Sequence, residues 1–376
     1  MRKVCYVTGT RADFGLMEIT LQTIQKHPQL NLSILVTGMH LLSSYGDTWR
    51  EIEQSNLPIG AKIPVELAGS SGAEMAIALG EQVIGFTRAL EKELPDMLLL
   101  LGDRGEMLAG AIAALHLNIH IIHIHGGELS GTIDDSVRHA ISKIAHYHFT
   151  ATENSRDRLI RMGEKPDNIF VTGAPGLDAI YQTNILEKNA LFASHGLNTT
   201  QPLSIILFHP VVQQANEAAE QMCALMDAVL EVGLQCLVIM PNADAGGSVI
   251  AQVIRDYCSH EQVQTVVHVP RREFISLMSH AAVMVGNSSS GIIEATSLGV
   301  PVVNIGDRQK YRDRNSNVVD VAPVRSEIVT ALTSAVQMKG QKWPNIYGDG
   351  KSAEQIAKYL ASISLSPDIL EKINAY

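Results

Sequence analysis

The apolar run at residues 97–101 constrains the fold more than any other stretch of the sequence. Its residues, Met-Leu-Leu-Leu-Leu, are all apolar, and Gly102-Asp103-Arg104 follow directly. A strand that is apolar on both faces is typical of a parallel sheet covered by helices on both sides. Strand-like runs of this kind alternate with segments of helical spacing along the chain. They occur at residues 4–8, 32–37, 63–67, 120–124, 149–152, 170–172, 203–208, 235–240, 265–268, 281–285 and 300–305. The alternation predicts an α/β fold of Rossmann-like, doubly wound parallel sheets.

Two such domains are expected, because 376 residues are too many for one ordinary core. A polar stretch at residues 181–202 lacks an apolar period and predicts a linker. We therefore expect an N-terminal domain at 1–180, a C-terminal domain at 203–350, and a final helix within 351–376 that packs back on the first domain. Ligands bind at the carboxyl ends of parallel strands, so the two sheets are expected to face a central cleft.

Composition excludes several classes of function. The formal net charge is −10, which argues against non-specific nucleic-acid binding and leaves an anionic ligand dependent on a few arginines. No run approaches the roughly 18 apolar residues of a membrane span, and the N-terminal run is too short for a signal peptide. The four cysteines have no Cys-x-x-Cys spacing, and Cys5 and Cys236 lie in strand-like runs. They indicate reduced core thiols in a cytoplasmic protein.

A second constrained stretch runs from Met284 to Arg308. An apolar strand ends at Gly286-Asn287, three serines follow, and a helix is expected as far as Gly299. A strand, a turn of small residues and a helix direct backbone N–H groups at a phosphate, and Asn287 or Ser288 is suited to cap the helix. Glu294 is placed to accept the hydroxyls of a ribose. An ordinary capped helix would show the same pattern, but Arg308 at the next strand end favours an anionic ligand.

Ionisable residues collect at the other strand ends. Each one alone has a structural explanation, such as a helix cap for Asp103 or a turn histidine for His125, but their number in one domain indicates a site. His120, His123 and His125 raise the possibility of a metal site. His120 lies on the opposite strand face from the other two, and there is no His-x-x-x-His pair, so no metal is expected.

The sequence resembles the hydrolysing UDP-N-acetylglucosamine 2-epimerases of sialic-acid synthesis, over nearly its whole length and in order. The motifs are Gly9-Thr10-Arg11-Ala12-Asp13, Thr37-Gly38-Met39-His40, Gly102-Asp103-Arg104, His125-Gly126-Gly127-Glu128, Ser130-Gly131-Thr132-Ile133-Asp134-Asp135-Ser136-x-Arg138-His139, Phe208-His209-Pro210, Gly286-Asn287-Ser288-Ser289, Gly306-Asp307-Arg308-Gln309 and Tyr347-Gly348-Asp349-Gly350. The resemblance implies a glycosyltransferase-B-type fold, a homodimer, and no metal or nicotinamide cofactor. It also implies conversion of UDP-N-acetylglucosamine and water to UDP and N-acetylmannosamine.

The resemblance, together with the chemistry of such a reaction, assigns roles to individual residues. Asp103 and Asp134 are expected to transfer protons, Glu128 and His125 are further candidates, Arg138 orients the acids, and His209 donates a proton or contacts the diphosphate. On the UDP side, Ser288 and Ser289 are expected to bind phosphate, Glu294 the ribose, and His268 with Phe274 the uracil. Arg11 and Arg308, with Arg104 nearby, would neutralise the leaving UDP. Asp13, His40 and Asp178 complete the expected substrate-binding set.

The sequence departs from the family pattern at two positions. Many relatives have glutamate at the position of His125, and some have lysine at the position of Leu16. The first difference leaves open which residue transfers the second proton. It also leaves the substrate open, because related hydrolysing enzymes act on a UDP-linked 2,4-diacetamido-trideoxy sugar for legionaminic acid. The motifs are also compatible with a non-hydrolysing 2-epimerase, a UDP-sugar glycosyltransferase, and a UDP-sugar sensor without activity. The glycosyltransferase is disfavoured by the acids clustered in the first domain.

Overall fold

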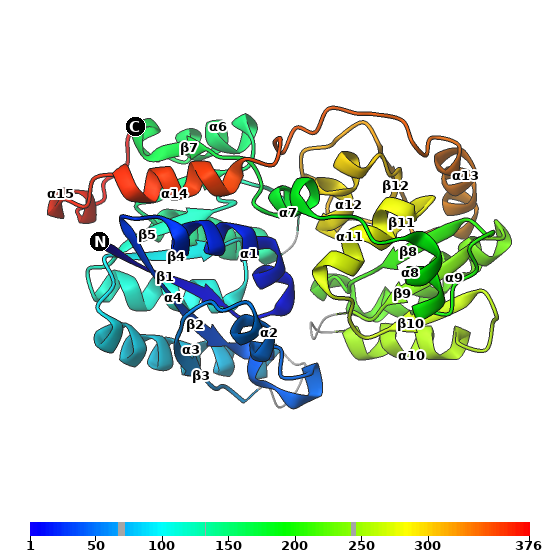
Figure 1. Cartoon of the computed structure of the whole chain (residues 1–376), viewed down its shortest axis with the longest axis horizontal. Coiled ribbons are helices and arrows are strands. Elements are labelled where there is room, and N and C mark those ends of the chain that lie inside the picture. Colours follow the sequence, from blue (N-terminus) through cyan, green and yellow to red (C-terminus); the bar gives the residue numbers. More distant parts are fainter. Residues whose placement is uncertain (67–71, 132, 242–245) are drawn as a thin grey trace. The chain divides into compact units, whose positions relative to one another are not determined.

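The computed structural model describes residues 1–66, 72–131, 133–241 and 246–376 (Figure 1). The chain forms two compact units. Unit 1 comprises Met1–Glu128, Ile133–Ala179 and Tyr347–Tyr376, and unit 2 comprises Leu129–Thr132 and Ile180–Ile346. Each unit contains one parallel sheet, which confirms the predicted fold class. No helix in the described part of the chain is long and apolar enough to cross a membrane.

Unit 1 contains a seven-stranded sheet of order β3-β2-β1-β4-β5-β6-β7. Its strands are β1 (Arg2–Thr8), β2 (Leu30–Thr37), β3 (Ile59–Ile63), β4 (Met97–Leu101), β5 (His120–Ile124), β6 (Tyr147–Thr150) and β7 (Ile169–Val171). Its α-helices are α1 (Arg11–Lys26), α2 (Trp49–Gln54), α3 (Gly72–Glu93), α4 (Gly105–His116), α5 (Ile133–Ile144), α6 (Glu153–Arg161), α14 (Ser352–Ser362), α15 (Pro367–Leu370) and α7 (Gly176–Gln182), which crosses into unit 2.

The central strands of unit 1 divide their side chains between two cores. Val4 and Tyr6 of β1 pack with α1 and α14, whereas Cys5 and Val7 pack with α3 and α4 on the opposite face. This alternation is the two-residue period of a strand that is buried on both sides. Helix α14, red in Figure 1, lies beside α1 and buries Ile356 in the first of these cores. The predicted return of the C-terminal helix to the first domain is thus confirmed.

Unit 2 contains a six-stranded sheet of order β10-β9-β8-β11-β12-β13. Its strands are β8 (Leu203–Leu207), β9 (Gln235–Ile239), β10 (Val263–Val266), β11 (Val283–Gly286), β12 (Val302–Ile305) and β13 (Val318–Val321). Its α-helices are α8 (Lys188–Ser194), α9 (Ala218–Glu231), α10 (Gly247–Tyr257), α11 (Arg271–His280), α12 (Ser289–Ile293) and α13 (Arg325–Val336). Helix α8 lies within the stretch expected to be a linker, and its Leu191 and Phe192 are buried in one of the unit's two cores.

Two predicted elements differ from the structure. The helix expected to reach Gly299 ends at Ile293 and is followed by a 3₁₀ turn, because Ser297 N donates to Glu294 O three residues earlier. The third strand runs from Ile59 to Ile63. Its pairing with the second strand begins where Ile34 N donates a hydrogen bond to Pro58 O. The strand was predicted at residues 63–67, of which residue 67 lies outside the described part of the chain.

Gly286 ends β11 in a conformation and a space that only glycine fits. Its φ is +131°, a region that side chains rarely adopt, and a Cβ there would overlap the carbonyl oxygen of Leu207 on the neighbouring strand. The close approach of β11 to β8 therefore depends on the absence of a side chain at this position.

We expect Gly286→Ala to lower the free energy of unfolding by about 2 kcal/mol or more, through backbone strain and overlap. Gly80 in the exposed middle of α3 is a matched control, because no atom lies within 4 Å of its Cβ position. Gly80→Ala should raise stability by about 0.5–1 kcal/mol. Urea denaturation of both variants measures the difference, and equal stability would contradict the close-approach argument.

Candidate active site in the two units

A buried arginine gathers the acids of unit 1. Arg138 lies on α5 and is only 1% exposed. One of its terminal nitrogens donates to Glu128 O at 3.1 Å and to Asp135 Oδ1 at 3.0 Å, and the other pairs with Asp103. A buried guanidinium requires such partners, since an unpaired charge in the interior is very unfavourable. The structure therefore brings Asp103, Glu128 and Arg138 together, as expected.

Asp103 does not serve as a helix cap, which was the simpler explanation for it. The N-cap of α4 is Arg104, and no side chain caps this helix. Asp135 is a second carboxylate partner of Arg138. Its position three residues before Arg138, on the same face of a helix, was the feature of the sequence that could have predicted this ion pair. Asp134 lies beside it in the first turn of α5 and is partly buried.

His125 occupies the turn after β5 in a conformation that is uncommon for a residue with a side chain. Its φ is +63°, and its backbone N donates to Phe149 O at 3.0 Å. Its Nδ1 lies 3.1 Å from Glu128 Oε1, and both side chains are largely buried. Left-handed backbone outside glycine is uncommon and concentrates at functional sites. The geometry thus supports a role for His125 together with Glu128.

Three of the predicted substrate-binding residues make hydrogen bonds within unit 1. Asp13 accepts hydrogen bonds from Gly9 N at 3.1 Å and Thr10 N at 2.8 Å and completes a capping box. Burial raises its pKa to about 6, although the hydrogen bonds from Thr8 and Thr10 oppose that shift. Its oxygens are engaged in the turn, and its predicted role in substrate binding stays a prediction.

His40 and Asp178 also have partners within unit 1, and their predicted roles in substrate binding stay predictions. His40 is fully buried, with its ring nitrogens 2.6 Å from Thr48 Oγ1 and 2.9 Å from Thr8 Oγ1, and burial lowers its pKa to about 4. Asp178 is 1% exposed and accepts from the backbone N–H groups of Ser352 at 3.2 Å and Ala353 at 3.0 Å, at the start of α14. Burial raises its pKa to about 6. The C-terminal helix depends on this cap.

The two arginines expected near the diphosphate in unit 1 have carboxylate partners. Arg11 forms a two-point ion pair with Glu51. Arg104 Nε lies 3.3 Å from Glu106 Oε2. Glu106 is nearly buried, and its side chain fills the space where a Cβ on Gly9 would lie. In this structure the two positive charges are thus balanced within unit 1.

Asn287 joins three strand ends of unit 2. Its side chain accepts from His209 N at 2.7 Å and donates to His209 O at 2.8 Å. Its carbonyl accepts from Arg308 at 3.1 Å and from Gln309 at 3.1 Å. Asn287 therefore cross-links the strands, and the helix cap is Ser288, which accepts from Ser290 N at 3.3 Å. Ser289 is the first residue of α12.

Glu294 has one carboxylate oxygen in an ion pair and one buried oxygen without a hydrogen-bond partner among the described residues. It is 1% exposed, and one carboxylate oxygen pairs with Arg271. The other oxygen, Oε2, is buried and has no hydrogen-bond partner among the described residues. A buried carboxylate oxygen without a donor is unfavourable, so this position suits a ligand hydroxyl. Arg271 was not among the predicted site residues. Its position at the start of α11, directly after the His268-Val269-Pro270 turn, was the feature of the sequence that could have indicated it.

The remaining predicted residues of unit 2 flank this pair. Phe274 lies on α11, one turn after Arg271, and is nearly buried. His268 is partly exposed, but its Nε2 is buried and has no partner among the described residues. Both are therefore positioned on the same local segment as the Arg271–Glu294 pair. Within the described part of the chain, no group of three or more His, Cys, Asp or Glu side chains has an arrangement that could hold a metal ion.

Comparison with known proteins identifies the family to which the chain belongs. The UDP-N-acetylglucosamine 2-epimerase family matches residues 22–361, and the chain belongs to this family. It is 48% identical over 376 residues, 100% of both chains, to the hydrolysing UDP-N,N'-diacetylbacillosamine 2-epimerase of Legionella pneumophila. It is 34% identical to the UDP-N-acetylglucosamine 2-epimerase of Neisseria meningitidis, over 90% of this chain and 88% of that one.

Solved structures of similar proteins support the fold. The UDP-N-acetylglucosamine 2-epimerase from Neisseria meningitidis, solved bound to UDP-N-acetylglucosamine, superposes with a TM-score of 0.80 at 19% identity. The match covers 95% of this chain and 99% of that one. The Methanocaldococcus jannaschii enzyme, in complex with UDP-N-acetylglucosamine and UDP, gives a TM-score of 0.80 at 21% identity and the same coverage.

The buried state of His40 predicts a pH dependence of stability. Its pKa falls from 6.5 in the unfolded chain to about 4 in the fold, so between these values only the unfolded chain binds the proton. The free energy of unfolding should therefore drop by roughly 2–3 kcal/mol as pH falls from 6.5 to 4. His40→Gln, which is always neutral, should lose this part of the slope. Thermal midpoints measured across this pH range test it, and exposed His116→Gln, the control, should follow the unaltered protein.

Proposed function

We propose that the protein is a hydrolysing 2-epimerase of UDP-2,4-diacetamido-2,4,6-trideoxyglucose, also called UDP-N,N'-diacetylbacillosamine. The products would be UDP and 2,4-diacetamido-2,4,6-trideoxymannose. The observation that carries the proposal is the 48% identity, over the full length of both chains, with the Legionella pneumophila enzyme of that name. The sequence alone favoured UDP-N-acetylglucosamine as substrate, whereas this proposal takes the diacetamido sugar. UDP-N-acetylglucosamine remains the second candidate because of the 34% identity with the Neisseria meningitidis enzyme.

The chemistry explains why such an enzyme needs acids and a diphosphate site. The hydrogen on carbon 2 of the sugar is not activated, so the bond from carbon 1 to the diphosphate breaks as the proton leaves. The products of this elimination are UDP and a 2-acetamidoglucal. Water then adds across the double bond, and its hydroxyl goes to carbon 1. The proton is added to carbon 2 on the face opposite to the one from which the first proton left. Proton transfer by positioned acids and stabilisation of the leaving diphosphate are the two requirements.

The residues of unit 2 suit the nucleotide. Ser288 and Ser289 and the backbone around them would bind phosphate, and Arg308 would contribute positive charge. Glu294 would accept a ribose hydroxyl, because its Oε2 is buried and without a donor. His268 and Phe274 would contact the uracil. His209, whose backbone Asn287 holds, would contact the diphosphate or donate a proton.

The residues of unit 1 suit the proton transfers. Asp103 and Asp134 would remove and deliver the carbon-2 proton, with Glu128 and His125 as the second candidate pair. Arg138 would orient Asp103, with which it forms an ion pair. Arg11 and Arg104 would reach the leaving UDP only by exchanging their present carboxylate partners. The homodimer and the cytoplasmic location implied at the outset stay predictions.

The substrate is tested by incubating the protein with each UDP-sugar separately, in deuterium oxide and without an acceptor. Proton NMR should detect free UDP and a manno-configured sugar with deuterium at carbon 2, because the mechanism exchanges that hydrogen. Turnover should be faster with the diacetamido sugar. An epimer that stays attached to UDP would indicate the non-hydrolysing reaction. No UDP release without an acceptor would favour a glycosyltransferase, and faster release from UDP-N-acetylglucosamine would reverse the substrate order.

The division of labour between the units predicts different defects for two variants. Arg308→Ala should weaken UDP binding by roughly 1.5–3 kcal/mol, since it removes a charged donor to phosphate. Asp103→Asn should leave UDP affinity nearly unchanged while lowering turnover by about 10² or more. Calorimetric titration with UDP and steady-state kinetics measure the two effects. If Asp103→Asn weakened UDP binding as much as Arg308→Ala, Asp103 would not be a proton-transfer residue.

A further inference from the structure

We propose that His123 is a positioning residue for this reaction. It holds the Gly102–Asp103 turn in place and is itself held by Ser142, whose carbonyl accepts a hydrogen bond from Lys372. The inference rests on the proposed function, in which Asp103 transfers a proton. None of these three supporting residues belongs to the nucleotide or acid groups described above. Their connection is a continuous series of hydrogen bonds within unit 1.

The hydrogen bonds of His123 fix its tautomer. The side chain is fully buried on β5, with Nε2 2.7 Å from Gly102 O and Nδ1 3.0 Å from Ser142 Oγ. A carbonyl oxygen only accepts, so Nε2 carries the hydrogen and Nδ1 accepts from the serine hydroxyl. Burial lowers the pKa of His123 to about 3, which keeps the ring neutral at working pH. The imidazole therefore acts as a rigid spacer with one donor and one acceptor.

The ring supports both turns that carry the proposed catalytic residues. Gly102 has a φ of +79°, its N donates to Ile124 O at 2.9 Å, and its O accepts from His123. The backbone N–H and C=O of Gly102, the residue before Asp103, are thus both hydrogen-bonded. On the other side, a Cβ on Gly126 would lie 2.9 Å from His123 Nδ1, so the ring also packs against the turn after His125.

Ser142 links this ring to the helix that carries Arg138. The two residues are one turn apart on α5, and the carbonyl of Ser142 accepts from Lys372 Nζ at 2.8 Å. Lys372 also donates to Ala145 O at 2.5 Å, so it caps the carbonyls at the end of α5. Its position fixes the C-terminal end of the helix whose first half bears the acids.

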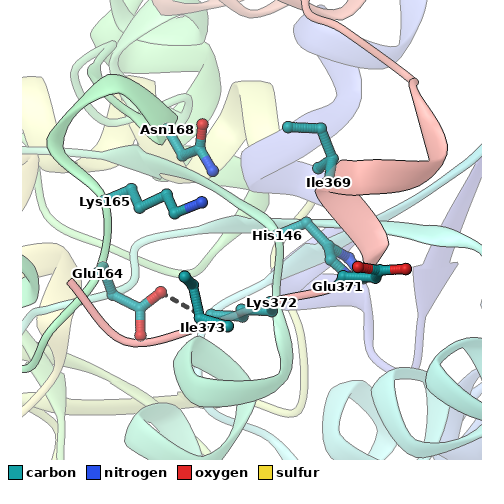
Figure 2. Close-up of a pocket in the computed structure, with 8 residues that line it drawn as sticks. All are labelled: His146, Glu164, Lys165, Asn168, Ile369, Glu371, Lys372 and Ile373. Atoms are coloured by element: carbon teal, nitrogen blue, oxygen red, sulfur yellow. Dashed lines mark ion pairs between the residues drawn. The ribbon is translucent and has the colours of Figure 1, made fainter.

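Glu164 anchors Lys372 in turn, as Figure 2 shows by a dashed line. The carboxylate is 2% exposed and lies 2.6 Å from Lys372, 2.8 Å from Lys143 and 3.0 Å from His148. The tail is held again where Ala375 N donates to Gly163 O at 2.8 Å. This buried ionic cluster is distant in sequence from the acids but continuous with them through Ser142 and His123.

Two substitutions separate positioning from simple packing. The amide nitrogen of glutamine can occupy roughly the place of histidine Nε2, whereas that of asparagine reaches only the place of Nδ1. His123→Gln therefore retains the donor to Gly102 O, and His123→Asn loses it. Both side chains are neutral, but asparagine is the smaller and leaves the larger cavity at this buried position. A role in packing alone would therefore lower the melting temperature more for His123→Asn than for His123→Gln, while the folded fraction of each kept its kcat.

The test measures kcat and KM for UDP release, UDP affinity by calorimetry, and melting temperature. For His123→Asn we expect a kcat about 10–100-fold lower, the usual effect of removing a supporting hydrogen bond, with KM and UDP affinity within about threefold. His123→Gln should recover most of that kcat. Equal kcat for the two variants, or a loss that follows melting temperature alone, would overturn the proposal.

A second pair of variants decides the question if the His123 variants fail to fold. Lys372→Met should lower kcat by about tenfold with unchanged UDP affinity, because α5 loses its anchor. Asn374→Ala removes the tail contact with Lys143 but not the link to Ser142, and should retain normal turnover. Equal activity of these two variants would contradict the proposal. Absence of turnover in the unaltered protein on both UDP-sugars would instead refute the proposed function.

Discussion

Burial of both faces of each sheet is the constraint that shapes the rest of this protein. Side chains such as Leu98 and Leu99 face different cores, so the strands have no solvent-facing side. Polar groups that could meet a ligand are therefore concentrated in the turns after the strands, where backbone groups need partners. Those turns contain Asp103, His125 and Asn287, each fixed by contacts with neighbouring strands or helices. The same packing that stabilises the fold decides where a reaction can take place.

Several arginines near the predicted site residues form ion pairs with nearby carboxylates, although the chain as a whole is acidic. Arg138 pairs with Asp103 and Asp135, Arg11 with Glu51, and Arg271 with Glu294. Buried ion pairs contribute little net stability, but the loss of one partner leaves an uncompensated charge. In this protein such pairs fix the direction of carboxylates that the proposed reaction uses. Glu294 illustrates the principle, since its ion pair orients one oxygen and leaves the other for a ligand.

Family membership and substrate choice depend on different features. The match over residues 22–361 and the two parallel sheets establish a UDP-N-acetylglucosamine 2-epimerase family member. The substituents on the sugar depend on a few side chains, and a fold shared at about 20% identity does not select among them. We expect His125, which stands in place of the glutamate of many relatives, to be one such side chain. Its left-handed backbone and its contact with Glu128 place it among the acids.

The fold class could be predicted from sequence, because apolar runs such as residues 97–101 are typical of strands that are buried on both sides. The sequence also indicated which turns carry chemistry, since Asp103, Glu128 and Arg138 do lie together. It did not show which polar residues make hydrogen bonds with distant parts of the fold. Asp13, His40 and Asp178 follow strands just as Asp103 does, but hydrogen bonds with Thr10, Thr48 and the start of α14 engage them. These cases were settled by tertiary packing, because each depends on how the polar group meets its neighbours in space. Arg271 meets Glu294 across 23 residues, and Lys372 meets Ser142 across 230. A local pattern records the spacing within one helix or strand, but not which helix end a C-terminal lysine will cap.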